Sequence, residues 1–65
     1  MITVVREPEG REQTFEHVHT VHKLLNKLGA RPGAVLVIRG AELLTQDRRI
    51  EDGELIIVRK VRSSG

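Results

Sequence analysis

The sequence predicts a single α+β domain in which one helix packs on one face of a mixed sheet of four to five strands. Three observations support this prediction. One stretch has the apolar spacing of a helix, several short stretches are rich in β-forming residues, and glycine or proline separates most of them. The chain has 65 residues, which is the length of one domain. A helix held to one side of a sheet is the packing that defines the α+β class.

The first elements are predicted to form a hairpin. Residues 1–6 are rich in β-branched side chains, and residues 11–16 alternate weakly, as a return strand does. Between them, residues 7–10 (Glu-Pro-Glu-Gly) combine proline and glycine at the spacing of a tight reversal.

The helix is predicted over residues 21–28. Thr20 precedes it and is a good N-cap, because its hydroxyl can accept a hydrogen bond from a free N–H of the first turn. The apolar residues recur at i, i+3, i+4 and i+7 and form one stripe, namely Val21, Leu24, Leu25 and Leu28. Gly29 stands where a left-handed residue ends a helix, and Pro32 prevents its resumption. A stripe this short is not stable alone, so the helix must pack on the sheet.

The second half of the chain supplies the remaining strands. Residues 34–38 are a continuous apolar run, which suits a central strand. Residues 42–44 predict a short strand, and residues 54–61 predict the last one. Residues 55–58 are four apolar residues in a row, so one alternating pair is expected to face outward. We expect the first and last strands to be neighbours in the centre of the sheet.

A polar loop joins the last two strands. Residues 45–49 are polar, and Arg48 and Arg49 are expected to be solvated there. Ile50 is the apolar anchor of this segment, and Asp52-Gly53 predicts the turn that follows it.

Composition excludes several classes of function. The chain has no cysteine, so it has no disulfide, thiolate metal site or cysteine nucleophile, which fits a reducing cytoplasm. Eleven lysines and arginines stand against nine acidic residues, and Phe15 is the one aromatic residue. Binding of single-stranded nucleic acid relies on stacking between bases and aromatic side chains, so we expect no nucleic-acid partner. No apolar run approaches the length of a membrane span, and no nucleophile–base pair or glycine-rich phosphate loop suggests an enzyme.

Three histidines invite a metal hypothesis that we do not favour. His17, His19 and His22 are spaced H-x-H-x-x-H. The first two would share a side if the strand continued through them, but the third lies in the first helical turn. No cysteine or aspartate completes a ligand set, so we expect no metal site.

The last strand runs into a tail of small residues. We predict a domain over residues 1–62 and a flexible C-terminal tail over residues 63–65, which are Ser63, Ser64 and Gly65. Such a tail places a carboxylate where another protein can reach it, so the Gly65 carboxylate is the candidate working group. Candidate docking residues lie on the last strand and beside the tail, namely Ile57, Arg59, Lys60 and Arg62. The basic members are either a solvated strand end or a means of steering toward an acidic groove.

Several stretches of sequence, in this order, resemble a known family. They are residues 20–25 (Thr-Val-His-Lys-Leu-Leu), 35–40 (Val-Leu-Val-Ile-Arg-Gly) with 42–44 (Glu-Leu-Leu), and 50–57, followed by a terminal glycine. Over nearly the whole chain the pattern resembles the ubiquitin-like β-grasp sulfur carriers of the ThiS and MoaD type. The thiamine (thiazole) branch is closer, because the chain is short and the helix opens with Thr-Val-His. The family ends in Gly-Gly, whereas this chain ends in Ser64-Gly65, so only the terminal glycine carries over.

The resemblance implies a carrier without bound cofactor or metal that partner enzymes act on. An E1-like adenylating enzyme would use ATP to transfer AMP onto the Gly65 carboxylate. A sulfur donor would displace AMP and leave a C-terminal thiocarboxylate, and a sulfur-accepting synthase, that of the thiamine thiazole first, would take the sulfur. The carrier would be a cytoplasmic monomer that docks on larger enzymes.

Other classes stay open at this point. A ubiquitin-like modifier would share the adenylation of Gly65 but would be joined to lysines of target proteins. A non-conjugated β-grasp interaction module would have an inert tail, and Ser64 keeps that alternative open. An RNA-binding β-grasp domain is weakened by the missing aromatic residues and the small net charge of +2.

Overall fold

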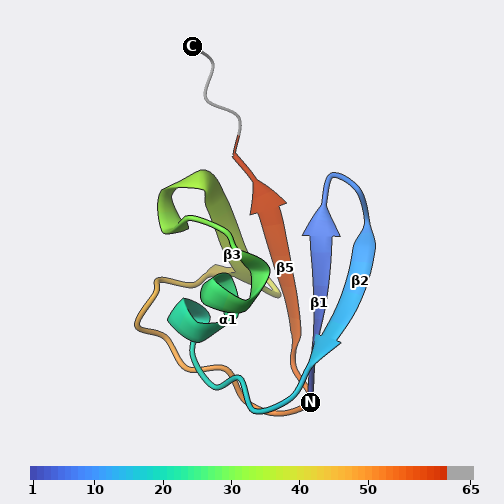
Figure 1. Ribbon diagram of the computed structural model, residues 1–65, viewed down its shortest axis with the longest axis vertical. Coiled ribbons are helices and arrows are strands. Elements are labelled where there is room, and N and C mark those ends of the chain that lie inside the picture. Colours follow the sequence, from blue (N-terminus) through green and yellow to red (C-terminus); the bar gives the residue numbers. More distant parts are fainter. Residues whose placement is uncertain (62–65) are drawn as a thin grey trace.

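The computed structural model describes residues 1–61 of the chain, and its five strands form one mixed sheet. Strands β1 (Ile2–Glu7) and β2 (Arg11–Phe15) form the N-terminal hairpin, and β3 (Val35–Arg39) and β4 (Glu42–Leu43) form a shorter one. Strand β5 (Leu55–Lys60) lies between the two hairpins, so the order is β2-β1-β5-β3-β4 (Figure 1). Strands β1 and β5 are parallel, and every other pair is antiparallel. The prediction that the first and last strands are central neighbours is confirmed.

Helix α1 (Val21–Leu28) begins and ends where the sequence predicted. The Thr20 hydroxyl accepts a hydrogen bond from the backbone N–H of Lys23 at 3.2 Å, which is the N-cap interaction. Gly29 ends the helix with φ of 68°, a left-handed conformation that a residue with a Cβ adopts only at a cost. The chain then forms a short 3-10 helix, η1 (Pro32–Ala34), before β3.

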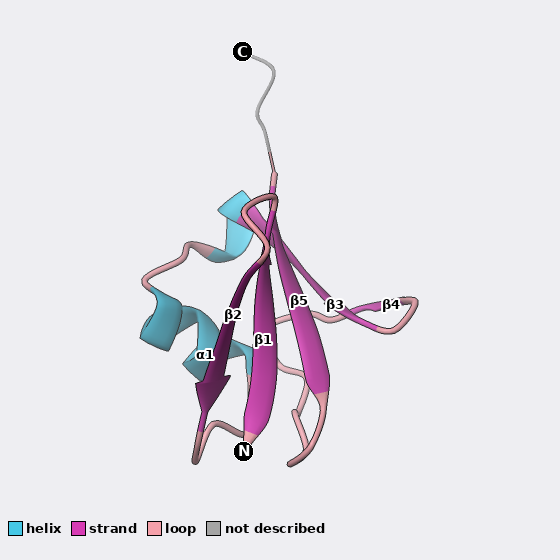
Figure 2. Ribbon diagram, turned by 90° about the vertical axis from the view of Figure 1, so that its right-hand side faces the viewer, coloured by secondary structure: helices cyan, strands magenta, loops and turns pink. Residues whose placement is uncertain are grey.

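The helix covers one face of the sheet, and apolar side chains fill the space between the two layers (Figure 2). The buried cluster consists of Ile2, Val4, Val18, Val21, Leu24, Leu25, Val35, Val37, Leu44, Ile50, Ile56 and Val58. Full burial of one such side chain contributes about 1.5–3 kcal/mol to the stability of the folded state. Contact with the sheet therefore stabilises the short helix. Phe15, Leu28 and Ala30 pack against the edge of this cluster.

The strand boundaries differ by one residue from the predicted ones. Strand β3 starts at Val35 because Ala34 closes the 3-10 helix. Strand β5 covers 55–60 of the predicted 54–61, and β2 ends at Phe15, before the predicted 16. Leu44 lies outside strand β4, yet its N–H still donates to the Val37 carbonyl at 2.8 Å.

Sequence reasoning did not predict that the loop after β4 caps the helix. The backbone N–H groups of Val21 and His22 donate to the carbonyls of Arg48 and Gln46, each at 3.1 Å. These donors belong to the first helical turn, whose N–H groups have no partner within the helix. Ile50, the predicted anchor, is buried, and its N–H donates to the His19 carbonyl at 2.8 Å. The loop is therefore fixed to the first turn of the helix and to the segment just before it.

The observed fold is the predicted α+β architecture, consistent with the ubiquitin-like β-grasp fold that the resemblance implied. None of the helices in residues 1–61 has the length and apolar character that crossing a membrane requires. The predicted boundary between a domain over 1–62 and a tail over 63–65 lies outside the described residues.

Candidate functional site

The predicted site residues divide into two groups. Ile57, Arg59 and Lys60 lie on strand β5 and are described by the structure. Arg62 and the three tail residues Ser63, Ser64 and Gly65 lie outside the described residues. The described part of the candidate site is therefore strand β5 and the surfaces around its end.

The side chains of strand β5 alternate between the two faces of the sheet. Ile56 is fully buried and Val58 nearly so, both beneath the helix. Leu55 is 53% exposed, and Ile57 is partly exposed. The outward-facing pair that the apolar run predicted is therefore Leu55 and Ile57. Helix α1 lies on the other face, so this pair faces away from the core.

Ile57 belongs to an apolar row that crosses the outer face of the sheet. The pairing register places Val5 beside Ile57 on one side and Ile38 on the other, and Leu43 beside Ile38. Directly paired residues of neighbouring strands point to the same face, so these four residues form one continuous line, here called the outer row. Leu43, on the two-residue strand β4, is 61% exposed. Glu12 of strand β2 pairs with Val5 and ends the row with a charge.

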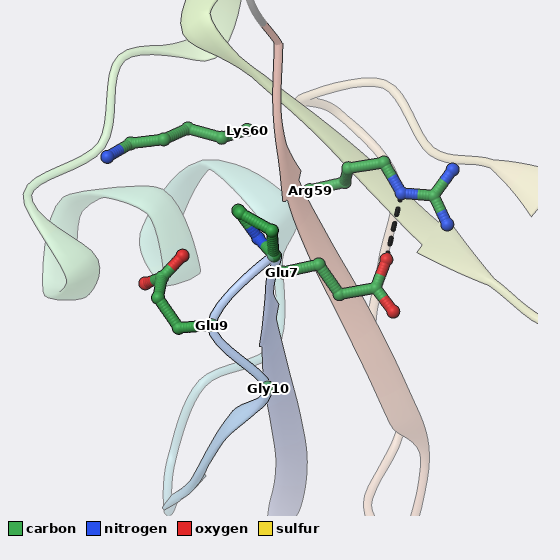
Figure 3. Close-up of a pocket in the computed structure, with 6 residues that line it drawn as sticks. Glu7, Glu9, Gly10, Arg59 and Lys60 are labelled. Atoms are coloured by element: carbon green, nitrogen blue, oxygen red, sulfur yellow. Dashed lines mark hydrogen bonds and ion pairs between the residues drawn. The ribbon is translucent and has the colours of Figure 1, made fainter.

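A hollow lies at the end of the sheet, between the β1–β2 turn and the end of β5. It is lined by Glu7, Pro8, Glu9, Gly10, Arg59 and Lys60 (Figure 3). The predicted reversal at residues 7–10 thus lies next to the strand from which the chain continues toward Gly65. The Val61 N–H donates to the Ala34 carbonyl at 3.0 Å, which fixes the backbone immediately after β5.

Arg59 is already paired. Its Nε donates to the Glu7 carboxylate at 2.8 Å, across the parallel register that places Glu7 beside Arg59. An exposed ion pair of this kind contributes at most about 1 kcal/mol to the stability of the fold. It does, however, compensate the charge of Arg59. The basic end of the strand is therefore less positive than the sequence alone indicates. Lys60 points to the other side of β5 and is exposed.

The loop arginines Arg48 and Arg49 are both exposed, as predicted, and Arg48 also takes part in a network of ion pairs. Arg48 pairs with Glu42 at 3.0 Å, and Arg39 pairs with Glu42 at 3.0 Å and with Glu54 at 3.1 Å. The hydrogen bond from Arg39, followed by that from Arg48, lowers the pKa of Glu42 below its usual range. The hydrogen bond to Glu42 is likewise the main cause that raises the pKa of Arg39. This network ties the β3–β4 hairpin, and with it the exposed Leu43, to the start of β5.

Sequence reasoning missed this network and the Glu7–Arg59 pair. The i, i+3 spacing of Arg39 and Glu42 was the one local signal in the sequence for this network. Arg48 and Glu42 are six residues apart and meet across the loop after β4. Arg39 meets Glu54, and Glu7 meets Arg59, only because the sheet brings distant parts of the chain together.

The three histidines do not form one cluster. His17 follows the end of strand β2 with a positive φ of 62°, so the strand does not continue through His17 and His19. His22 is exposed at the start of α1, where its ring nitrogens lie 3.4 Å from the side-chain amides of Gln46 and Asn26. Within residues 1–61, no three His, Cys, Asp or Glu side chains are grouped in a way that suits a metal ion.

Comparison with known proteins gives a match along the whole chain. The sequence is 31% identical over 65 residues to the sulfur carrier protein TtuB of Thermus thermophilus, and the match covers 100% of both chains. No family model matches the sequence. The equal lengths and unbroken coverage mean that the relative aligns with both the sheet and the C-terminal residues of this chain.

Proposed function

This chain belongs to the sulfur carrier protein family, and from this premise we propose that it carries sulfur as a thiocarboxylate on Gly65. The full-length similarity to a sulfur carrier is the observation on which the proposal mainly rests. The chain itself performs no catalysis in this proposal. Its contribution is a reachable carboxylate and a surface on which partner enzymes dock.

The chemistry takes place in two displacement steps, the first at the α-phosphorus of ATP and the second at the carboxyl carbon of Gly65. An oxygen of the Gly65 carboxylate attacks the α-phosphorus of ATP, an acyl–adenylate forms, and pyrophosphate leaves. Hydrosulfide (HS⁻) supplied by the sulfur donor then attacks the carboxyl carbon. A C–S bond forms, the C–O bond to AMP breaks, AMP leaves with the bonding electrons, and the proton on sulfur is released to water. A C-terminal thiocarboxylate remains, which a synthase uses as its sulfur source.

The outer row is the docking surface that we propose for the adenylating enzyme. Ile57 lies at its centre, and the exposed Leu43 lies at one end. A row of apolar side chains exposed on one face of a sheet is typical of a surface that another protein covers. Arg59 and Lys60 lie beyond this row on β5, and Arg62 follows them in the sequence. In this proposal the three basic residues guide the tail to the active site of the enzyme.

The sulfur acceptor that we propose is the synthase of the thiamine thiazole. This assignment rests on the short chain and on the Thr20-Val21-His22 start of the helix. A comparison of sulfur-transfer rates tests this assignment. The rate to the thiazole synthase is measured beside the rates to a molybdopterin synthase and to a tRNA-thiolating enzyme. Faster transfer to either of the latter two would replace the thiazole assignment while leaving the carrier role intact.

The carrier role is tested by the intact mass of the protein. The chain is incubated with ATP, the E1-like adenylating enzyme of the same organism and a sulfur donor. We expect a mass gain of one oxygen-to-sulfur exchange, and we expect deletion of Gly65 to abolish that gain. If the mass does not change while the same enzyme converts a Gly-Gly carrier, the chain is an interaction module with an inert tail. A mass gain on other proteins, at their lysines, would instead identify a modifier.

A further inference from the structure

The proposed function sets a geometric limit on any enzyme that acts on Gly65. Four residues follow Val61, and four fully extended residues span at most about 14 Å. The reacting atoms of the enzyme must therefore come within that distance of Val61, the residue that follows the end of β5. Because an enzyme encloses its reacting atoms in protein, its surface must meet the end of the sheet as well as the tail.

Two of the four charged side chains that line the hollow have no ionic partner among the described residues. Glu9 belongs to the β1–β2 turn, Lys60 is the last residue of β5, and both are exposed and line the hollow. No ion pair within residues 1–61 involves either of them, whereas Arg59 beside them is compensated by Glu7. Figure 3 shows Glu9 and Lys60 on one side of the turn and the Glu7–Arg59 pair on the other.

The presence of both signs of charge indicates the kind of partner. A hollow that offers one carboxylate and one ammonium group favours neither a free anion nor a free cation. A protein surface, in contrast, can present both complementary charges in a fixed arrangement. Such exposed charges affect mainly the rate and the selectivity of association, since a partner with like charges is repelled.

We propose that Glu9 and Lys60 form a two-charge contact by which the adenylating enzyme recognises this chain. A cationic side chain of the enzyme faces Glu9, and an anionic one faces Lys60. This inference rests on the proposed function and adds a selectivity contact to it. Lys60 lies on the side of β5 that faces the helix, whereas Ile57 of the outer row lies on the opposite face. In this proposal the enzyme therefore contacts both faces of β5.

Charge reversal with matched controls tests the contact. Glu16→Lys is the control for Glu9→Lys, because both change the net charge by the same amount. Lys23→Glu is the control for Lys60→Glu for the same reason. Glu16 lies one residue beyond the far end of β2 and Lys23 lies on the exposed face of the helix, so neither control residue lines the hollow. The measurement is kcat/KM for ATP–pyrophosphate exchange with the adenylating enzyme of the same organism, at low and high salt, after circular dichroism has shown that each variant is folded.

We expect Glu9→Lys and Lys60→Glu to lower kcat/KM by about tenfold or more at low salt, and the two controls to stay within about twofold of the wild type. The loss should shrink at high salt because screening weakens exposed charge pairs. If the wild type is adenylated and the hollow variants match their controls, the two-charge contact is wrong and the carrier role stands. If the wild type is not adenylated at all, both proposals fall.

Discussion

Val5 and Ile57 lie side by side on the parallel strands β1 and β5, and both belong to the face of the sheet that lies opposite helix α1. Their neighbours on the strands, Val4 and Ile56, are fully buried under the helix. A single alternating register thus gives the central strands a core face and an apolar outer face. The same register separates the side chains that hold the fold together from those proposed to meet a partner.

The outer row can be tested at its most exposed member. We expect Leu43→Glu to lower kcat/KM for adenylation by about tenfold, through KM, because docking would bury an unpaired carboxylate in an apolar contact. Leu43 is 61% exposed on an edge strand, so the change in stability should stay within about 0.5 kcal/mol. Thr14→Glu, on an exposed position outside the row, adds the same charge and is the control. Equal losses in the two variants would mean that the outer row is not the docking surface.

Adjacent positions of β5 should differ sharply in their effect on stability. Ile56→Ala removes a fully buried side chain and should cost about 2–5 kcal/mol. Leu55→Ala acts on a side chain that is 53% exposed, and it should cost less than about 1 kcal/mol. Urea unfolding measures the loss of unfolding free energy in both variants, provided that the m-value does not change. Similar costs at the two positions would show that the outward-facing side is as tightly packed as the core.

The N-cap of the helix offers a second test of stability. Thr20→Ala removes the hydroxyl that accepts from the Lys23 N–H, and we expect a loss of about 1 kcal/mol. Thr20→Ser keeps the acceptor and should stay close to the wild type. Thermal unfolding of the two variants separates the lost hydrogen bond from the lost methyl group. A Ser variant as unstable as the Ala variant would assign the effect to packing of the methyl group.

Stability should also fall at acidic pH through Asp52. The hydrogen bond from the Met1 α-amino group, at 2.8 Å, is the main cause that lowers the pKa of Asp52 from its usual value of 3.8. A carboxyl group with a lowered pKa in the folded state stabilises the fold above its unfolded pKa and loses that contribution as pH falls through its folded pKa. The Asp52 contribution is therefore complete at neutral pH and disappears below the usual value.

The variant Asp52→Asn isolates this contribution. Its stability should be lower than that of the wild type near neutral pH, and the difference should vanish as the pH falls well below 3.8. Urea midpoints across the acidic range measure it, with Glu16→Gln as a control that removes an exposed carboxylate. A difference that persists unchanged at the lowest pH would mean that the ion pair is not its source.

The features that the sequence predicted correctly are those with local causes. The cap at Thr20, the stripe of α1 and the left-handed Gly29 each depend on residues within two turns of one another. Strand alternation alone predicted that one alternating pair of residues 55–58 faces outward. These parts of the fold and the presence of an outward-facing apolar pair on the last strand could therefore be predicted from the sequence, whereas the outer row depends on the register between strands.

The features that were missed depend on register between distant segments. Glu7 and Arg59 are 52 residues apart in the chain and meet only because β1 and β5 pair in one particular parallel register. The contact of the 45–50 loop with the start of the helix has the same origin. Composition and periodicity contain no information on such pairings, so the charges at the end of the sheet could not be assigned partners from the sequence.

The residue before the terminal glycine gives the last prediction. Because the carriers that this chain resembles end in Gly-Gly, we expect residues 64 and 65 to pass through a narrow channel of the adenylating enzyme, where a Cβ takes up space that a glycine leaves free. Ser64→Gly should therefore keep kcat/KM at the wild-type value or above it, whereas Ser64→Val should lower it by about tenfold or more. Ser63→Val makes the same kind of change one residue earlier, farther from the reacting carbon, and should have a smaller effect. An Ser64→Val variant that is adenylated as efficiently as the wild type would show that the channel does not select for small residues, and Ser64 would then be no obstacle to the carrier role.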